Sequence, residues 1–166
     1  MNREGSFEVR YKLKSRQWSE IGKNMLSAAP WRDVKVILDR RTDPLGEPIN
    51  EIDAMVTSHG MAALGEKWQE VDSDAANELL RRMLGYALTQ FDEVLSEMER
   101  NTTADHIIDT MRAHPRFFTN VLSFDEVGLQ SWNPISGQHF DAAVVGIDND
   151  FVGIVAVFEN GLPSQE

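Results

Sequence analysis

The side chains best suited to recognition lie in the last fifty residues. Trp132 follows Asp125 and Glu126 in a segment rich in turn-forming residues. An aromatic side chain near carboxylates is typical of a protein-binding hot spot for a basic surface. Asp148 and Asp150 add two carboxylates in a short polar turn. We therefore predict partner-binding residues at Asp125, Glu126, Trp132, Asp148 and Asp150, with burial of Trp132 in the core as the alternative.

The four histidines give little support for catalysis. His59, His106, His114 and His139 lack the spacing of a zinc site. His106 and Asp109 would share a helix face and could form half of a general base, but no nucleophile accompanies them. Phosphate-binding loops and serine-nucleophile motifs are absent from the sequence. We therefore expect no catalytic residue, no metal and no cofactor.

Composition places the chain in the ordinary globular class. It has 166 residues, of which 42% are hydrophobic and 26% are charged, as expected for one domain over residues 1–166. The absence of cysteine excludes disulfides, thiol nucleophiles and thiolate zinc sites. The first residues are charged where an export signal would be apolar, and no long apolar run follows. A cytoplasmic location without a membrane segment is therefore expected.

Charge is distributed unevenly along the chain. The formal net charge of −11 disfavours nucleic acid as a partner, because binding to phosphates requires a basic surface. Residues 1–41 contain 10 basic and 5 acidic side chains, whereas residues 117–166 contain 7 acidic side chains and no Lys or Arg. Such acidity either serves solubility or attracts a basic partner.

The first part of the chain shows two alternating patterns. Residues 7–14 and residues 33–39 alternate between apolar and polar side chains, which predicts two strands. Apolar spacing over residues 18–29 predicts a helix between them. A cluster of Pro and Gly predicts a loop over residues 40–48, and an interrupted helix is expected over residues 50–68.

The longest predicted element is a helix over residues 72–101. Its apolar residues recur every three or four positions, from Ala76 through Phe91 to Met98. At about 1.5 Å per residue this helix would cross the whole domain, so other segments should pack along it. A shorter helix is expected over residues 104–113.

The residue pattern of the C-terminal part predicts mostly strands. A strand is predicted over residues 117–124, followed by a loop over residues 125–139. Two apolar runs, residues 140–147 and 151–158, flank a polar turn and predict a central hairpin. The predicted fold class is α+β, with an antiparallel sheet of four or five strands from both chain ends packed against a long central helix and shorter helices.

Small size, acidity, lack of cysteine and an α+β layout together resemble the bacterial immunity proteins, which neutralise toxins, many of them basic nucleases. The resemblance is one of profile and assigns no functional residue. It implies a non-enzymatic protein whose carboxylates bind a basic partner protein such as a toxin or nuclease domain. One alternative is a small enzyme or ligand-binding domain with a pocket between helix and sheet that uses His106 or His139. Another is a chaperone or assembly subunit with an exposed apolar groove.

Overall fold

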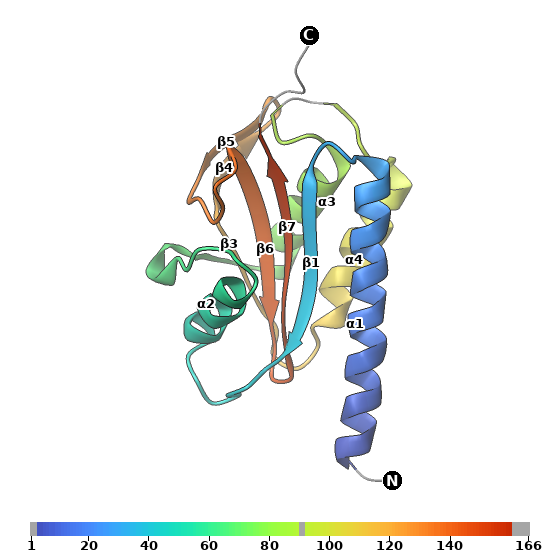
Figure 1. Cartoon of the computed structure of the whole chain (residues 1–166), viewed down its shortest axis with the longest axis vertical. Coiled ribbons are helices and arrows are strands. Elements are labelled where there is room, and N and C mark those ends of the chain that lie inside the picture. Colours follow the sequence, from blue (N-terminus) through green and yellow to red (C-terminus); the bar gives the residue numbers. More distant parts are fainter. Residues whose placement is uncertain (1–2, 90–91, 161–166) are drawn as a thin grey trace.

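A computed structural model describes residues 3–89 and 92–160 of the chain. It has an antiparallel five-stranded sheet in the order β1-β7-β6-β3-β2 and a separate two-stranded sheet of β4 and β5 (Figure 1). The strands are β1 (Asp33–Arg40), β2 (Gln69–Val71), β3 (Arg116–Thr119), β4 (Val121–Asp125), β5 (Gly128–Trp132), β6 (Phe140–Ile147) and β7 (Phe151–Glu159). The helices are α1 (Arg3–Ala28), α2 (Pro48–Ser58), η1 (Gly65–Lys67, 3-10), α3 (Ser73–Gly85) and α4 (Glu97–Thr110). The α+β class and the antiparallel sheet are confirmed.

The predicted hairpin of β6 and β7 forms the centre of the sheet. Its pairing runs from Phe140 opposite Glu159 to Ile147 opposite Val152. Every residue of β7 is buried, and in β6 only Phe140 is partly exposed. Successive side chains of a strand point to opposite faces, so strands buried along their whole length must be covered on both faces.

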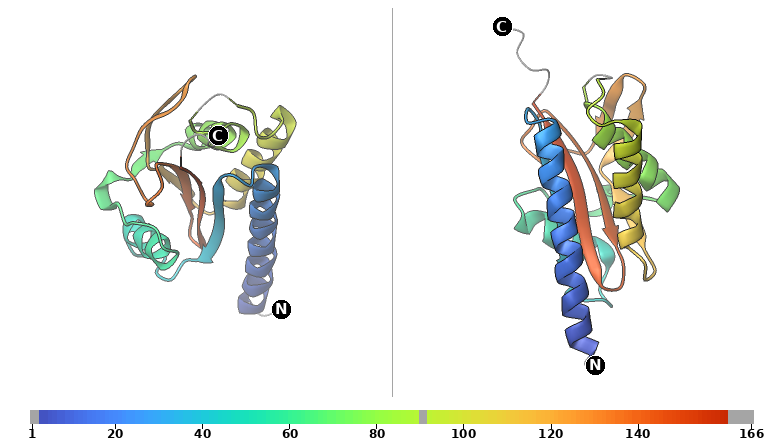
Figure 2. Two further views of the ribbon diagram at one scale, coloured as in Figure 1. Left: turned by 45° about the horizontal axis from the view of Figure 1, so that its top comes forward. Right: turned by 90° about the vertical axis from the view of Figure 1, so that its right-hand side faces the viewer.

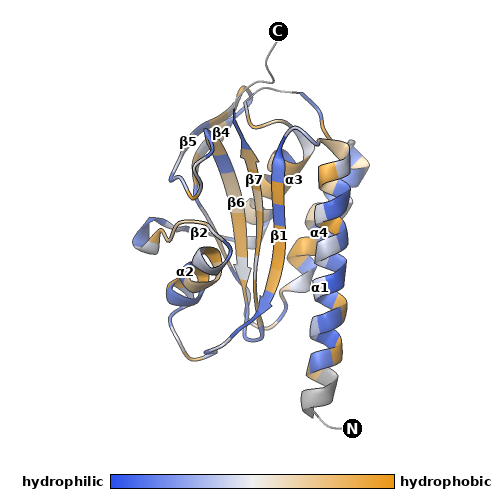
Figure 3. Cartoon of the chain, viewed as in Figure 1, coloured by the Kyte–Doolittle hydropathy of each residue, from blue (hydrophilic) through white to orange (hydrophobic). Residues whose placement is uncertain are grey.

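Helices cover the two faces of the sheet unequally. Figure 2 shows α1, α3 and α4 on one side of the sheet and α2 on the other. Even-numbered and odd-numbered residues of β7 separate into two cores accordingly. The first core includes Trp18, Leu80, Ile107, Val155 and Val157, and the second includes Ile52, Val56, Trp68, Ile154 and Ala156. Figure 3 shows hydrophobic residues concentrated on the central strands, with polar residues over much of α1.

The strand predicted over residues 7–14 is wrong, because this segment belongs to α1. Phe7 and Tyr11 lie one helical turn apart and both stack on Phe151, at centroid distances of 5.5 and 6.1 Å. Val9 and Leu13, on another face of the helix, are 67% and 54% exposed. Eight alternating residues fit either a strand or two helical faces, and here the contacts with Phe151 favour the helix.

The predicted helix over residues 72–101 is two helices. It begins as expected at Asp72, whose side chain accepts from the backbone of Ala75, but α3 ends at Gly85. The backbone N–H groups of Val94 and Leu95 both donate to the Gly85 carbonyl, at 2.6 and 3.2 Å, so the chain folds back there. The side chain of Arg100 occupies the space that a Cβ at this glycine would need.

α4 starts a new helix and is not a continuation of α3. Ser96 and Glu99 form a reciprocal capping box at its N-terminus. The helix predicted over residues 104–113 is the second half of α4, which ends at Thr110. Phe91, the midpoint of the predicted long helix, lies outside the described residues.

Three further segments of the structure differ from the boundaries predicted for them. The interrupted helix expected over residues 50–68 stops at Ser58, and Gly60 and Gly65 have positive φ angles of 81° and 56°. The strand expected over residues 117–124 is divided at Asn120 into β3 and β4. The expected loop over residues 125–139 contains β5. Within the described residues no helix has both the length and the apolar character needed to cross a bilayer.

Candidate functional site

The β4–β5 hairpin exposes two of the predicted partner-binding carboxylates at its tip. Asp125 accepts from the backbone of Val127 at 2.8 Å and from Gln130 Nε2 at 3.3 Å, which orders the turn. Glu126 is exposed and forms no ion pair with any described residue. Val127 is 67% exposed, so an apolar side chain adjoins the two carboxylates.

The hairpin is fixed to the segment that follows α3. Gly128 has a φ of 132° and lies so close to the Leu88 carbonyl that a Cβ would collide with it. Leu129 N donates to Leu88 O at 2.7 Å. Leu88 N in turn donates to both carboxylate oxygens of Glu159, at 3.1 and 3.0 Å. The end of β7 therefore holds the hairpin in place.

Glu159 belongs to a buried ion pair. Its carboxylate lies 3.6 Å from Arg32 Nη1, and the two side chains are 1% and 0% exposed. Arg32 also donates to the carbonyls of Met83, Leu84 and Tyr86, at 2.9 to 3.2 Å, and so caps the C-terminus of α3. Burial lowers the pKa of Arg32 and raises the pKa of Glu159, because each charge is removed from water.

Trp31, the residue before this arginine, is 45% exposed and borders a cavity of about 260 Å³. Asp92 and Glu93 line the same cavity, with apolar walls from Ala28, Ala29 and Val94. The turn after α1, the segment after α3 and the β4–β5 hairpin all lie at the top of the molecule in Figure 1. We call this surface the acidic end and define it by Trp31, Asp92, Glu93, Asp125, Glu126 and Val127.

The remaining predicted residues lie elsewhere. Trp132 ends β5 and is half-buried, with its ring 5.3 Å from that of Phe140. Asp148 and Asp150 lie in the β6–β7 turn, at the bottom of the sheet in Figure 1. β7 runs from this turn to Glu159, and its nine residues span roughly 26 Å at about 3.3 Å for each of the eight steps between them. The five predicted residues therefore do not form one continuous surface.

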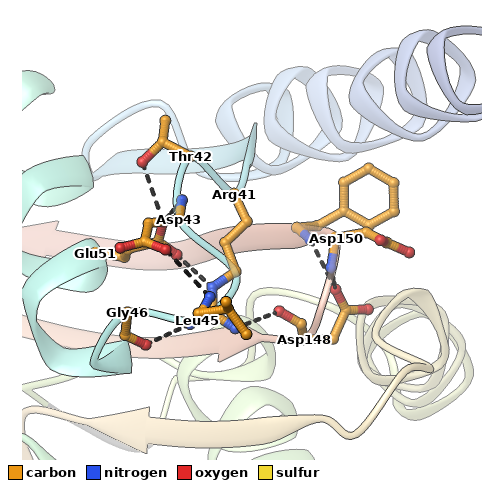
Figure 4. A network of polar contacts seen from close by, with 9 residues as sticks. Arg41, Thr42, Asp43, Leu45, Gly46, Glu51, Asp148 and Asp150 are labelled. Carbon is orange, nitrogen blue, oxygen red and sulfur yellow. Dashed lines mark hydrogen bonds and ion pairs between the residues drawn. The ribbon is translucent and has the colours of Figure 1, made fainter. Parts of the chain in front are cut away.

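Asp148 is 3% exposed, and its carboxylate holds the β6–β7 turn. One oxygen accepts from the backbones of Asp150 and Phe151, at 2.8 and 2.7 Å, and the other accepts from Arg112 N at 3.1 Å. Its carbonyl accepts from Arg41, which also pairs with Glu51 (Figure 4). These bonds turn the Asp148 carboxylate inward, away from any partner.

The two aspartates of this turn should therefore respond differently to mutation. Asp148→Ala is expected to lower the free energy of unfolding by about 3 kcal/mol, because three backbone N–H groups lose their acceptor. Asp150→Ala is the matched control and should cost less than about 0.5 kcal/mol, since its carboxylate accepts no hydrogen bond from a described residue. Urea unfolding of both variants measures the difference. Equal losses would contradict the structural role of Asp148.

The histidines lie apart from one another. His139 is exposed and contacts the Asn160 carbonyl at 3.0 Å, and His59 contacts Asp39 at 3.1 Å. His106 is exposed beside a cavity between α1 and α4, whereas the predicted pocket was between helix and sheet. In the part of the chain that the structure describes, no three His, Asp or Glu side chains are grouped to hold a metal ion.

Trp31 was not among the residues predicted from the sequence, and Asp92 and Glu93 were predicted to lie within a continuous helix. The signal for Trp31 was its position directly after Pro30, between two predicted elements, where a large side chain is often left exposed. For the two carboxylates the local signal was Gly85, a glycine inside the helical pattern, whereas its contact with Arg100 exists only in the folded chain.

Comparison with known proteins assigns no family. No family model matches the chain, and no curated protein and no solved structure was found to be similar to it. A function for this chain can therefore be inferred only from its own sequence and structure.

Proposed function

We propose that the chain is a non-enzymatic binding protein that neutralises a basic partner protein, as an immunity protein neutralises its toxin. The observation that carries the proposal is the acidic end, where the exposed indole of Trp31 borders a cavity lined by Asp92 and Glu93. A Lys or Arg side chain entering this cavity would meet an aromatic ring and two carboxylates, the groups that bind cations best.

Charge supports the same proposal. Asp92, Asp125 and Glu126 have no ion-pair partner among the described residues, whereas Glu93 pairs with Arg100 at 3.2 Å. Unpaired carboxylates on a chain of net charge −11 attract a basic partner over long distances and accelerate association. The exposed side chain of Val127 supplies apolar area beside Asp125 and Glu126.

Rigidity supports it as well. The hairpin is held at Leu88, and Leu88 is held by the buried Glu159 and its partner Arg32. A surface that is ordered before binding loses less conformational entropy when the complex forms. The acidic end is therefore built on buried polar contacts at this end of the sheet.

Binding kinetics test the proposal, with the basic protein encoded beside the gene for this chain as the partner, because an immunity gene normally lies beside its toxin. Asp92→Asn, Asp125→Asn and Glu126→Gln together should slow association about tenfold at low salt and less at physiological salt. Trp31→Ala should instead accelerate dissociation about thirtyfold, as expected for a hot-spot aromatic residue.

The matched control carries Asp74→Asn, Glu78→Gln and Glu97→Gln, which change the charge equally on exposed positions of α3 and α4. It should leave dissociation unchanged and slow association by less than about twofold. If both triple variants slow association equally, the acidity acts only as net charge. If Trp31→Ala leaves dissociation unchanged, the cavity is not part of the interface.

A further inference from the structure

An open groove lies between α1 and α4. Two adjoining cavities, of about 490 and 380 Å³, share Gln17 and His106 as wall residues. Figure 2 shows the two helices side by side, with the sheet behind them. We call this surface the α1–α4 groove, and it is separate from the acidic end in both position and charge.

One half of the groove is basic. Arg10, Lys14 and Arg112 line it, together with His106 and a single carboxylate, Asp109. Six arginines of the described residues form ion pairs with carboxylates, but these three cations form none with any carboxylate that the structure describes. In a chain with 27 acidic and 16 basic side chains, such a concentration of unpaired cations is unexpected.

Lys14 is held in the basic half of the groove by its own contacts. Its Nζ donates to the Thr110 carbonyl at 3.1 Å and lies 4.9 Å from the centre of the Phe151 ring. Burial lowers the pKa of Lys14, and the positive charges of Arg10 and Arg112 lower it further, against the opposing attraction of Asp148 and Asp150. An anion bound beside Lys14 in this half of the groove would offset the repulsion that the two arginines exert on Lys14.

The other half of the groove is more apolar. Ile21, Thr102 and Thr103 line it, together with Arg16 and Glu20, whose side chains have aliphatic stems. The Glu20 carboxylate is engaged by Lys23 at 3.6 Å. A ligand that fills both halves therefore needs an anionic group and an apolar body.

We propose that the α1–α4 groove binds a small amphipathic anion, with its carboxylate or phosphate group between Arg10 and Arg112 and its apolar body along Ile21. The guanidinium groups bind either anion through paired N–H donors. Lys14 is held by α4 and contributes charge without needing to move. This function is independent of the binding proposed for the acidic end.

Calorimetric titration with octyl phosphate, octanoate, inorganic phosphate and octanol tests this proposal. Octyl phosphate and octanoate should both bind, and their relative affinities distinguish phosphate from carboxylate as the preferred group. Inorganic phosphate should bind at least about tenfold more weakly than octyl phosphate, because it fills only the basic half. Octanol should not bind measurably. Binding of octanol as tight as that of octyl phosphate would overturn the proposal.

Variants locate the site. Arg10→Gln with Arg112→Gln should weaken octyl phosphate binding at least about tenfold, because two charge-assisted contacts are lost. The matched control, Lys12→Gln with Lys67→Gln, removes the same charge from residues outside the groove and should change affinity less than about twofold. Thermal unfolding verifies that both proteins are folded. Equal weakening in the two variants, or none in the first, would contradict the assignment.

Discussion

Replacing Asp141 with alanine is expected to lower the free energy of unfolding at neutral pH by about 3 kcal/mol. Its side chain is fully buried and joins β6 to the loop that precedes it. It accepts from Asn120 Nδ2 at 2.7 Å, from the backbones of Ile135 and Ser136 at 3.1 to 3.2 Å, and from Ser136 Oγ at 2.8 Å. Alanine would leave the backbone N–H groups of Ile135 and Ser136 and the Ser136 hydroxyl without this acceptor. Asn120 Nδ2 would keep only its bonds to the backbone carbonyls of residues 133 and 141.

Urea unfolding measures this loss, with Asp33→Ala at an exposed position as the control. The control should cost less than about 0.5 kcal/mol. A loss below about 1 kcal/mol for Asp141→Ala would show that water replaces the carboxylate and that the network does not hold the loop.

The same carboxyl predicts a pH dependence. Burial raises the pKa of Asp141 above its ordinary value of 3.8, despite the opposing hydrogen bonds from Ser136, Ile135 and Asn120. The folded protein therefore holds this proton more tightly than the unfolded chain does. The resulting stabilisation is fully present below 3.8 and is lost as the pH rises through the raised pKa.

The variant Asp141→Asn lacks this titration. The stability difference between the wild-type protein and the variant should therefore shrink as the pH rises from about 4 to about 8 in urea unfolding. A difference that grows with pH would mean that the hydrogen bonds outweigh burial at this carboxyl.

Removing Arg32 is expected to have the largest effect on stability. Arg32→Leu should cost about 4 kcal/mol, because Glu159 loses its only ion-pair partner among the described residues and three carbonyls at the end of α3 lose their donor. The loss should also loosen the β4–β5 hairpin, since Glu159 holds Leu88 and Leu88 holds Leu129.

A double-mutant cycle with Glu159→Gln measures the coupling. The double variant should be at least about 1 kcal/mol more stable than the sum of the single losses predicts, because it leaves no unpaired buried charge. Hydrogen exchange at the amides of Leu88 and Leu129 should accelerate in Arg32→Leu. Additive losses, with unchanged exchange at these amides, would show that the pair does not support the hairpin.

The parts of the fold that sequence patterns predicted are those determined locally. β1 and the β6–β7 hairpin follow from alternating or continuous apolar runs bounded by turn residues, and the structure confirms them. The N-terminal segment was mistaken for a strand because Phe7 and Tyr11 satisfy both periods. Only their common contact with Phe151, far along the chain, distinguishes the two.

The break between α3 and α4 was hidden for a related reason. Both helices pack against the first core, so their apolar spacing continues across the break. The residues that enforce the break, Gly85 and Arg100, meet only in the folded chain. Asp148 was misplaced among the surface carboxylates because an aspartate in a turn can either face solvent or bond the turn backbone. The sequence does not distinguish these roles.

Hydrogen exchange of the complex tests most directly whether the acidic end forms the interface with a basic partner, as we propose. Binding should slow exchange in the turn around Trp31, in the segment from Asp92 to Val94 and at the β4–β5 tip. The amides of α2 and of the β6–β7 turn should exchange as in the free protein. Protection confined to α2, the β6–β7 turn or the α1–α4 groove would contradict the assignment.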